Sequence, residues 1–393
     1  MIGATALADA QAYLQANDLD GWLVYDFQGS NPVFSQVVTG GPRHTTRRCY
    51  LFIPPRGAPT LLLHHVDANR LADLGWPIRT YLDLVDMDAG LRALLDGCRK
   101  LAMEYSPGCA LPVVSRADAG TVERIRSLGP DVVSSADLLQ YAVARWTPEQ
   151  LALHRSAARK LGDVVCQTFA FIGRNLKGDV AESDVVAHMR ELFAQCGLVA
   201  EHGPVVGVDA HSGDPHYEPT PTIRAPIRPE QWVLVDLWAK EREAGAVYAD
   251  ITWVAYTGST LPRPQRHVFE VVKEARDLAL RFLAEAHRQG RPVEGWEVDQ
   301  VARRHVEAAG FGRQFTHRLG HSLGVAVHSN GVNLDGFETH DTRKIIPGVG
   351  FSVEPGVYLP DFGVRSEVNV YVGHSGPEVT TPVQQEVVLI EPQ

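Results

Sequence analysis

The hydrophobic and polar positions in the first part of the chain alternate over short distances. Short apolar runs bounded by glycine, proline or polar residues predict strands, whereas residues 7–16 have the spacing of a helix. The predicted strands cover residues 21–26, 50–53, 60–63, 101–105 and 131–133. Strands mixed with helices in this way predict a small α/β unit, which we place at residues 1–145.

The pattern changes at Thr147, which is a favourable helix N-cap followed by Pro148 at the first helical position. From there on, long segments with helical spacing occur in pairs. The predicted helices cover residues 148–172, 182–196, 266–289 and 296–309, and the last three are followed by Gly197, Gly290 and Gly310. Strand-like segments alternate with these pairs, so we expect an α+β domain over residues 146–393.

The first predicted hairpin of this domain carries two acids in apolar strands. Residues 231–239 and 246–254 each contain one carboxylate that we expect to be buried, Asp236 and Asp250. If the turn is centred on Glu243, antiparallel pairing places the two acids directly opposite each other on one face. Like charges in cross-strand contact repel, and burial increases that repulsion. This hairpin therefore predicts a positive group between its acids.

A second hairpin near the C-terminus repeats the arrangement. Residues 350–354 and 363–370 read as strands on either side of a turn at 360–361, and symmetric pairing places Glu354 opposite Glu367. Together the two hairpins bring four carboxylates into apolar strands. Hard divalent cations neutralise such groups, and four carboxylates require two of them.

A cluster of histidines lies between the two hairpins. Residues 315–328 contain His317, His321 and His328, with glycines that allow close packing of the backbone. Upstream, His216 lies in a loop between two prolines. A neutral imidazole suits a divalent metal, either as a ligand or as a donor to a metal-bound oxygen. We therefore expect these histidines at the same site as the acids.

Composition and charge exclude several classes of partner. The 393 residues suit two domains, and 45% hydrophobic with 21% charged residues is typical of a globular protein. A net charge of -10 repels phosphate backbones and anionic lipid, so neither nucleic acid nor a membrane is expected as a partner. The five cysteines are scattered, and residues 1–10 lack a basic region, which favours a cytoplasmic protein.

Taken in order, these residues resemble the pita-bread metallopeptidases, and within them the prolidase and aminopeptidase P branch. The resemblance covers nearly the whole chain, with a creatinase-type N-terminal domain at 1–145 and the catalytic domain at 146–393. The family's five metal ligands fall on Asp236 (VDxx), Asp250 (DxT), His321 (GHxxG), Glu354 (EPGxY) and Glu367 (RxE). The resemblance implies two divalent ions, with Mn²⁺ expected and Co²⁺ or Zn²⁺ as alternatives.

The resemblance also implies the reaction, which is hydrolysis of the peptide bond before proline in a dipeptide or at the N-terminus of a short peptide. It implies that Glu354 accepts a proton from water and delivers it to the proline nitrogen, and that His328 stabilises the oxyanion. His216 and Arg365 then hold the proline side of the substrate, and His317 and Tyr358 fall on other active-site positions. The family tends to form homodimers.

Some residues depart from the family pattern, and several alternatives stay open. Trp253 stands where the family usually has arginine, and Val254 where it has threonine. We expect such changes to affect metal preference and substrate range. The alternatives are an atypical metallo-amidohydrolase of the same fold and a non-catalytic binding protein. A metal-free creatinase-like enzyme lacks these ligands, and a methionine aminopeptidase usually lacks the first domain. The sequence does not separate a dipeptidase from an aminopeptidase.

Overall fold

Separate hydrophobic cores divide the chain into two units, Met1–Arg145 and Trp146–Gln393. The structure is a computed structural model that describes residues 3–39, 43, 45–220 and 222–391. Within these ranges, no helix is both long enough and apolar enough to cross a membrane.

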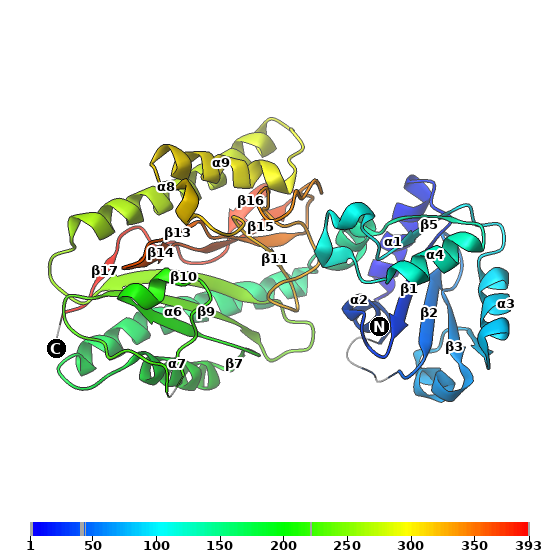
Figure 1. Cartoon of the computed structure of the whole chain (residues 1–393), viewed down its shortest axis with the longest axis horizontal. Helices are drawn as coiled ribbons and strands as arrows, with labels where there is room; N and C mark the ends of the chain where they lie inside the picture. Colours follow the sequence, from blue (N-terminus) through cyan, green and yellow to red (C-terminus); the bar gives the residue numbers. More distant parts are fainter. Residues whose placement is uncertain (1–2, 40–42, 44, 221, 392–393) are drawn as a thin grey trace. The chain divides into compact units, whose positions relative to one another are not determined.

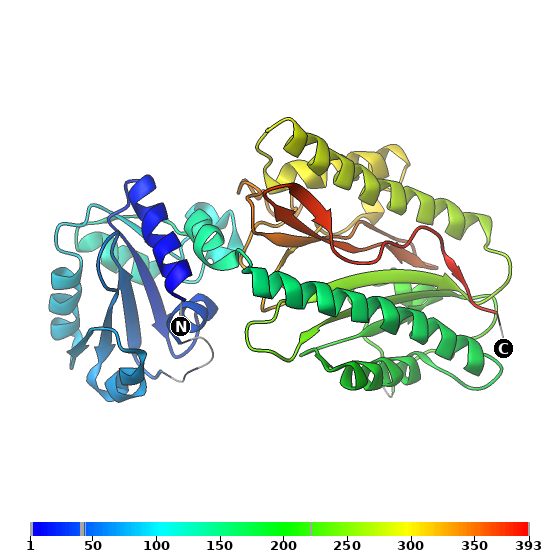
Figure 2. The same cartoon turned by 180° about the vertical axis from the view of Figure 1, so that it is seen from behind.

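The first unit is built on a mixed six-stranded sheet. Its strands, in spatial order, are β4 (Ile78–Tyr81), β3 (Thr60–His64), β2 (Arg48–Ile53), β1 (Gly21–Phe27), β5 (Lys100–Met103) and β6 (Asp131–Ser134). Alternate residues of β1 face opposite sides: Trp22 packs toward α1 (Ala4–Ala16) and Leu23 packs toward α3 (Leu84–Leu94) and α4 (Ala119–Ser127). Figure 2 shows α1 lying over one face of this sheet. The α/β prediction for this part of the chain is confirmed.

The second unit has two pairs of helices on opposite sides of its strands, as Figures 1 and 2 show. One pair is α6 (Pro148–Asn175) and α7 (Glu182–Cys196), and the other is α8 (Arg263–Arg288) and α9 (Gly295–Ala308). Thr147 caps α6 in a capping box with Gln150, and Gly197 ends α7 in the left-handed conformation, as the sequence predicts. These helices confirm the predicted pairs, although α8 begins three residues earlier than expected.

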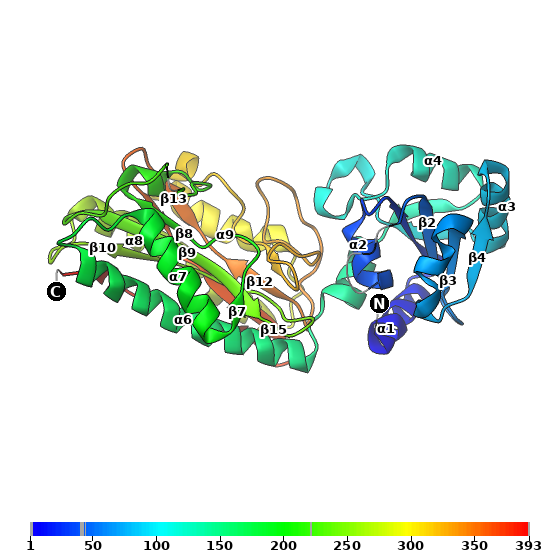
Figure 3. The ribbon, with the colours of Figure 1, turned by 90° about the horizontal axis from the view of Figure 1, so that it is seen from below.

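Two sheets and a short two-stranded ribbon lie between the helix pairs. The first sheet orders β17 (Val388–Leu389), β10 (Ala249–Tyr256), β9 (Trp232–Glu241) and β7 (Leu198–Val199), with β8 (Val205–Val208) also paired to β9. The second orders β11 (Ser322–Leu323), β12 (Gly350–Val353), β15 (Val368–Gly373) and β16 (Gly376–Val379). The ribbon pairs β13 (Gly356–Tyr358) with β14 (Gly363–Arg365). Seen from below in Figure 3, α6 lies along β9, and α7 lies beside α6.

The two faces of β9 have different partners. Val233, Val235 and Leu237 belong to the core formed with α6 and α7. Residues of the other parity, such as Asp236, therefore face the second sheet. The same alternation in β10 turns Asp250 toward that interior. The strand alternation thus places the acids between the two sheets.

The predicted register of the first hairpin is wrong by two positions. Asp236 pairs with Thr252, and Asp250 pairs with Trp238, so the two acids are diagonal neighbours rather than directly opposite. Both still face the same side, because a shift of two residues preserves the side-chain direction. The shift arises because Val247 and its neighbours do not form a strand. Val247 is apolar because it packs in a small cluster with Trp146 and Leu323.

The register of the second hairpin agrees with the prediction. Val353 pairs with Val368 on one side and Gly356 with Arg365 on the other, which keeps Glu354 across from Glu367. The return strand is interrupted, however, between β14 and β15. At this break the Glu367 backbone N–H donates to the carbonyl of Thr252 in β10 at 3.3 Å. The break therefore joins the second hairpin to the first.

His154 gives the second unit a pH-dependent stability. It is fully buried in α6, where its Nδ1–H donates to the Tyr248 carbonyl (2.8 Å) and its Nε2 accepts from the Thr380 hydroxyl (2.7 Å). Burial lowers its pKa to about 4. Between pH 6.5 and 4 the unfolded chain binds a proton that the native ring does not, so this group removes up to about 3 kcal/mol of stability as pH falls.

We expect His154→Gln to lack this part of the acid destabilisation. Urea unfolding of both proteins at pH 7 and pH 5 measures it. The gap in the free energy of unfolding between wild type and variant should narrow at pH 5. An equal pH dependence in the two proteins would contradict the assignment.

Candidate active site

A cavity of about 520 Å³ lies in the second unit. Its lining includes all five predicted metal ligands and four of the five other predicted site residues: Asp236, Asp250, His321, Glu354, Glu367, His216, His317, His328 and Arg365. The remaining one, Tyr358, lies behind the wall, with its hydroxyl 2.8 Å from Nε2 of His317. The structure therefore brings together residues that lie up to 151 positions apart, the separation from His216 to Glu367.

Asp250, His321 and Glu367 form a close group of potential metal ligands in this cavity. All three are buried, and one potential ligand atom from each lies within 4.8 Å of the others. Nε2 of His321 is 3.6 Å from Oδ2 of Asp250. Its Nδ1 lies 3.3 Å from the Ser322 carbonyl, which can only accept, so Nδ1 carries the proton and the Nε2 lone pair is free to bind a cation.

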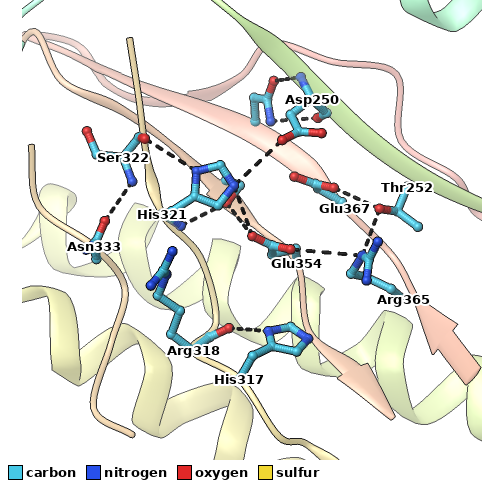
Figure 4. Close-up of polar contacts among 12 residues, drawn as sticks. Asp250, Thr252, His317, Arg318, His321, Ser322, Asn333, Glu354, Arg365 and Glu367 are labelled. Carbon is cyan, nitrogen blue, oxygen red and sulfur yellow. Dashed lines mark hydrogen bonds and ion pairs between the residues drawn. The ribbon is translucent and has the colours of Figure 1, made fainter. Parts of the chain in front are cut away.

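Glu354 lies beside the same imidazole. Its Oε1 is 3.3 Å from Nε2 of His321 and accepts a hydrogen bond from the Ser352 hydroxyl at 2.9 Å. Figure 4 shows its carboxylate between the His321 ring and Arg365. Glu354 follows β12 directly, so the end of that strand points its carboxylate into the cavity.

Asp236 makes a different contact. Its Oδ2 accepts from Nη2 of Arg365 at 2.5 Å. The same guanidinium donates to the Tyr358 hydroxyl (2.9 Å) and to Oγ1 of Thr252 (3.0 Å). Tyr358 can then donate to Nε2 of His317, whose Nδ1–H is held by the Arg318 carbonyl at 2.6 Å. A continuous chain of hydrogen bonds thus runs from Asp236 to His317 along the wall of the cavity.

His216 and His328 are both exposed residues of the lining. The ring of His328 stands edge-on to that of His321, with centroids 4.2 Å apart. The backbone N–H of His216 donates to Oδ1 of Asp214 at 3.0 Å, which fixes the local turn of its loop. Both imidazoles are therefore available to a bound molecule.

The electrostatics of the site keep His317, His321 and His328 neutral. Burial lowers the pKa of His317 to about 4 and that of His321 to about 3. The neighbouring His321, followed by burial, lowers the pKa of His328 to about 4. Burial and then the neighbouring acids raise the pKa of Asp250 and of Glu367 well above the usual range. The carboxylates are therefore not balanced by enough positive charge around them, and the neutral imidazoles do not provide it.

This donor set fits divalent metal ions. Over the ranges that the structure covers, Oδ1 of Asp236, Oδ1 of Asp250 and Oε1 of Glu367 are buried without a hydrogen-bond partner. Buried carboxylate oxygens without partners are costly. Carboxylates with one neutral imidazole are ligands that Mn²⁺, Co²⁺ and Zn²⁺ all accept. Divalent cations at this position would remove the cost.

The sequence reasoning missed three polar residues that hold the acids in place. The Ser352 hydroxyl joins the His321 backbone N–H (2.9 Å) to Glu354. The Thr252 hydroxyl donates to Oε2 of Glu367 at 2.8 Å. The side-chain amide of Asn369 pairs with both the N–H (2.8 Å) and the carbonyl (2.7 Å) of Asp250. In each case, the sequence signal that could have revealed the residue was a polar side chain within a largely apolar strand, on the same face as the acids.

Trp253 does not lie in the site, although the sequence placed it among the residues that could tune it. It has the opposite parity to Asp250 and Thr252 in β10, and it packs against the core of α6 and α7. Tryptophan in place of arginine at this position therefore affects packing against the helices α6 and α7. Among the described residues, we find no contact through which it would affect the metal ligands as expected.

Known proteins resemble the chain in sequence and in fold. A model of metallopeptidase family M24 matches residues 152–374. The probable dipeptidase PepE of Mycobacterium tuberculosis is 25% identical over 354 residues, covering 86% of this chain and 85% of that protein. Dipeptidase PepE from Mycobacterium ulcerans has the same fold, with a TM-score of 0.78 and 23% identity, covering 99% of this chain and 98% of that one. A prolidase from Pyrococcus horikoshii OT3 has a TM-score of 0.67 and 20% identity, covering 98% and 99%.

These likenesses confirm the pita-bread fold that the motifs indicate. The family match lies within the second unit, which also contains the cavity, the acids and the histidines. Members of such a family hydrolyse peptide bonds with divalent metal ions. The chain belongs to metallopeptidase family M24.

Proposed function

We propose that this protein is a dinuclear-metal Xaa-Pro peptidase, with its catalytic domain at residues 146–393 and a creatinase-like domain at 1–145. The ligands would be Asp236, Asp250, His321, Glu354 and Glu367. The observation that carries the proposal is the set of buried acid oxygens without partners around the neutral His321 imidazole. When bound, the cations would supply a water nucleophile at neutral pH and polarise the scissile carbonyl.

The chain's own residues would do the remaining chemistry. The Xaa-Pro nitrogen is tertiary and needs a proton to leave. Glu354 lies at the centre of the site, where its carboxylate can take a proton from water and give it to this nitrogen. His328, next to His321, would stabilise the oxyanion. His216, His317, Tyr358 and Arg365 would bind the substrate.

We expect Asn369→Ala to weaken metal binding about 10- to 100-fold, because the backbone of Asp250 loses the amide that orients it. It also leaves a buried N–H and a buried carbonyl unpaired, which costs about 1–3 kcal/mol for each group. Metal titration by calorimetry and urea unfolding measure the two effects. Unchanged metal affinity would show that the amide serves stability alone.

Substrate assays test the proposed function directly. An Xaa-Pro dipeptide, an Xaa-Pro-Xaa tripeptide and an Xaa-Ala dipeptide are compared after reconstitution with Mn²⁺, Co²⁺ or Zn²⁺. Metal-dependent cleavage before proline supports the proposal, and the first two peptides separate a dipeptidase from an aminopeptidase. Cleavage of Xaa-Ala alone would favour another peptidase of the family, and bound metal without cleavage would favour a binding protein. Light scattering tests the expected homodimer.

A further inference from the structure

A fully buried carboxylate lies behind the loop that carries His216. Glu182 is the first residue of α7 and has no exposed surface. It does not line the cavity, and the proposed reaction does not use it. The His216 loop, residues 209–220, lies between β8 and the first sheet's β9 and contributes Pro215, His216, Tyr217 and Glu218 to the cavity.

Glu182 accepts hydrogen bonds from four points in and around this loop. Its Oε1 accepts from the Val208 N–H at 2.8 Å and from Nδ1 of His211 at 2.9 Å. Its Oε2 accepts from the Tyr217 hydroxyl at 2.5 Å and from the Ala225 N–H at 2.7 Å. One carboxylate therefore holds the residue before the loop, two side chains within it and a residue after it.

Tyr217 connects this anchor to His216. Its ring stacks on that of His211 with centroids 4.1 Å apart, and its hydroxyl reaches Glu182. Burial, together with the hydrogen bond to Glu182, raises the pKa of Tyr217 above its usual range, so the hydroxyl stays a donor. His216 is the adjacent residue and is itself exposed. Its place in the cavity wall therefore depends on the residue that Glu182 holds.

We propose that Glu182 is a positioning residue for substrate binding, which acts through Tyr217 to hold His216 against the cavity. The inference rests on the proposed function, because it needs His216 to contact the substrate. Hydrogen bonds to a charged group are stronger than neutral ones, which suits a carboxylate for this role. The metal ligands belong to other segments, so loss of the anchor should leave metal binding unchanged.

Tyr217→Phe tests the proposal, because it removes the hydroxyl and keeps the stacking ring. On an Xaa-Pro dipeptide with Mn²⁺, we expect KM to rise about tenfold with kcat within about twofold, since one hydrogen bond to a charged group is lost. Glu182→Gln should give the same pattern, because either orientation of its amide leaves a backbone N–H without an acceptor. Tyr371→Phe is the matched control, since Tyr371 stacks on Trp146 and lies outside the loop.

A double-mutant cycle with His216→Ala separates positioning from a general loss of structure. If Tyr217 acts through His216, Tyr217→Phe should raise KM in the wild-type background and have no effect in His216→Ala. Equal effects in both backgrounds, or unchanged KM in Tyr217→Phe and Glu182→Gln, would overturn the inference. Unchanged KM in His216→Ala would overturn it together with the substrate role of His216. Absence of metal-dependent cleavage by the wild type would instead overturn the proposed function.

Discussion

Replacing Glu354 with glutamine is expected to lower kcat on an Xaa-Pro dipeptide by about 10²- to 10⁴-fold. An amide cannot take a proton from water and pass it to the proline nitrogen, and general acid–base catalysis contributes a factor of this size. Metal should be partly retained, because Asp250, His321 and Glu367 form a close group of potential ligands that does not include Glu354. Steady-state kinetics and metal analysis by mass spectrometry measure the two effects.

Glu378→Gln provides the matched control for this variant. Glu378 is paired with Arg155 at the surface, where its side chain is 46% exposed, so the same chemical change should leave kcat near the wild-type value. Wild-type turnover in Glu354→Gln would show that another group moves the proton.

Removing the metal ions is expected to abolish activity and to lower stability. Each cation would bind the native state, and at a hundred times its Kd a single site adds about 2.7 kcal/mol. Dialysis against a chelator followed by Mn²⁺ titration should therefore lower and then restore the melting temperature. Activity should return over the same range of Mn²⁺ concentration. An unchanged melting temperature would contradict the proposed metal site.

Asp250→Asn should affect stability in opposite directions in the metal-free and the metal-bound protein. The substitution removes a buried charge that lies close to Glu367, so the metal-free variant should be at least as stable as the metal-free wild type. With Mn²⁺ present, the order should reverse, because a ligand is lost. Asp361→Asn, at the exposed tip of the β13–β14 ribbon, is expected to behave like the wild type in both states.

Local signals predicted the fold well where they were strong. The segment 182–196 forms α7 with the same bounds, because Gly197 provides a clear helix end. The prediction of a strand at 246–254 was less accurate, because β10 begins only at Ala249. Val247, near the start of that segment, is apolar because it packs against Trp146, and β9 continues to Glu241, whose carboxylate pairs with Lys160 at 2.6 Å. Tertiary contacts of this kind determine the register, and a hydrophobic pattern does not contain them.

The site could be predicted in its acids and histidines, but not in the groups that hold them. Four carboxylates in apolar strands require neutralisation, and this follows from the sequence alone. The pairing of Asp236 with Arg365 does not follow from the sequence alone, because the two residues are 129 positions apart. The same holds for the contacts of Thr252 and Asn369. A lone threonine or asparagine in a strand does not reveal its partner before the strands are assembled.

The pairing of Asn369 with the backbone of Asp250 spans 119 positions of the chain. Such distant contacts are slow to form, because a large part of the polypeptide must be ordered before they stabilise the fold. An intermediate that has β9 and β10 but lacks the second hairpin would hold only half of the acids. The rate of Mn²⁺ uptake during refolding should therefore report when the two hairpins assemble, since high affinity is expected only after both acid pairs have come together.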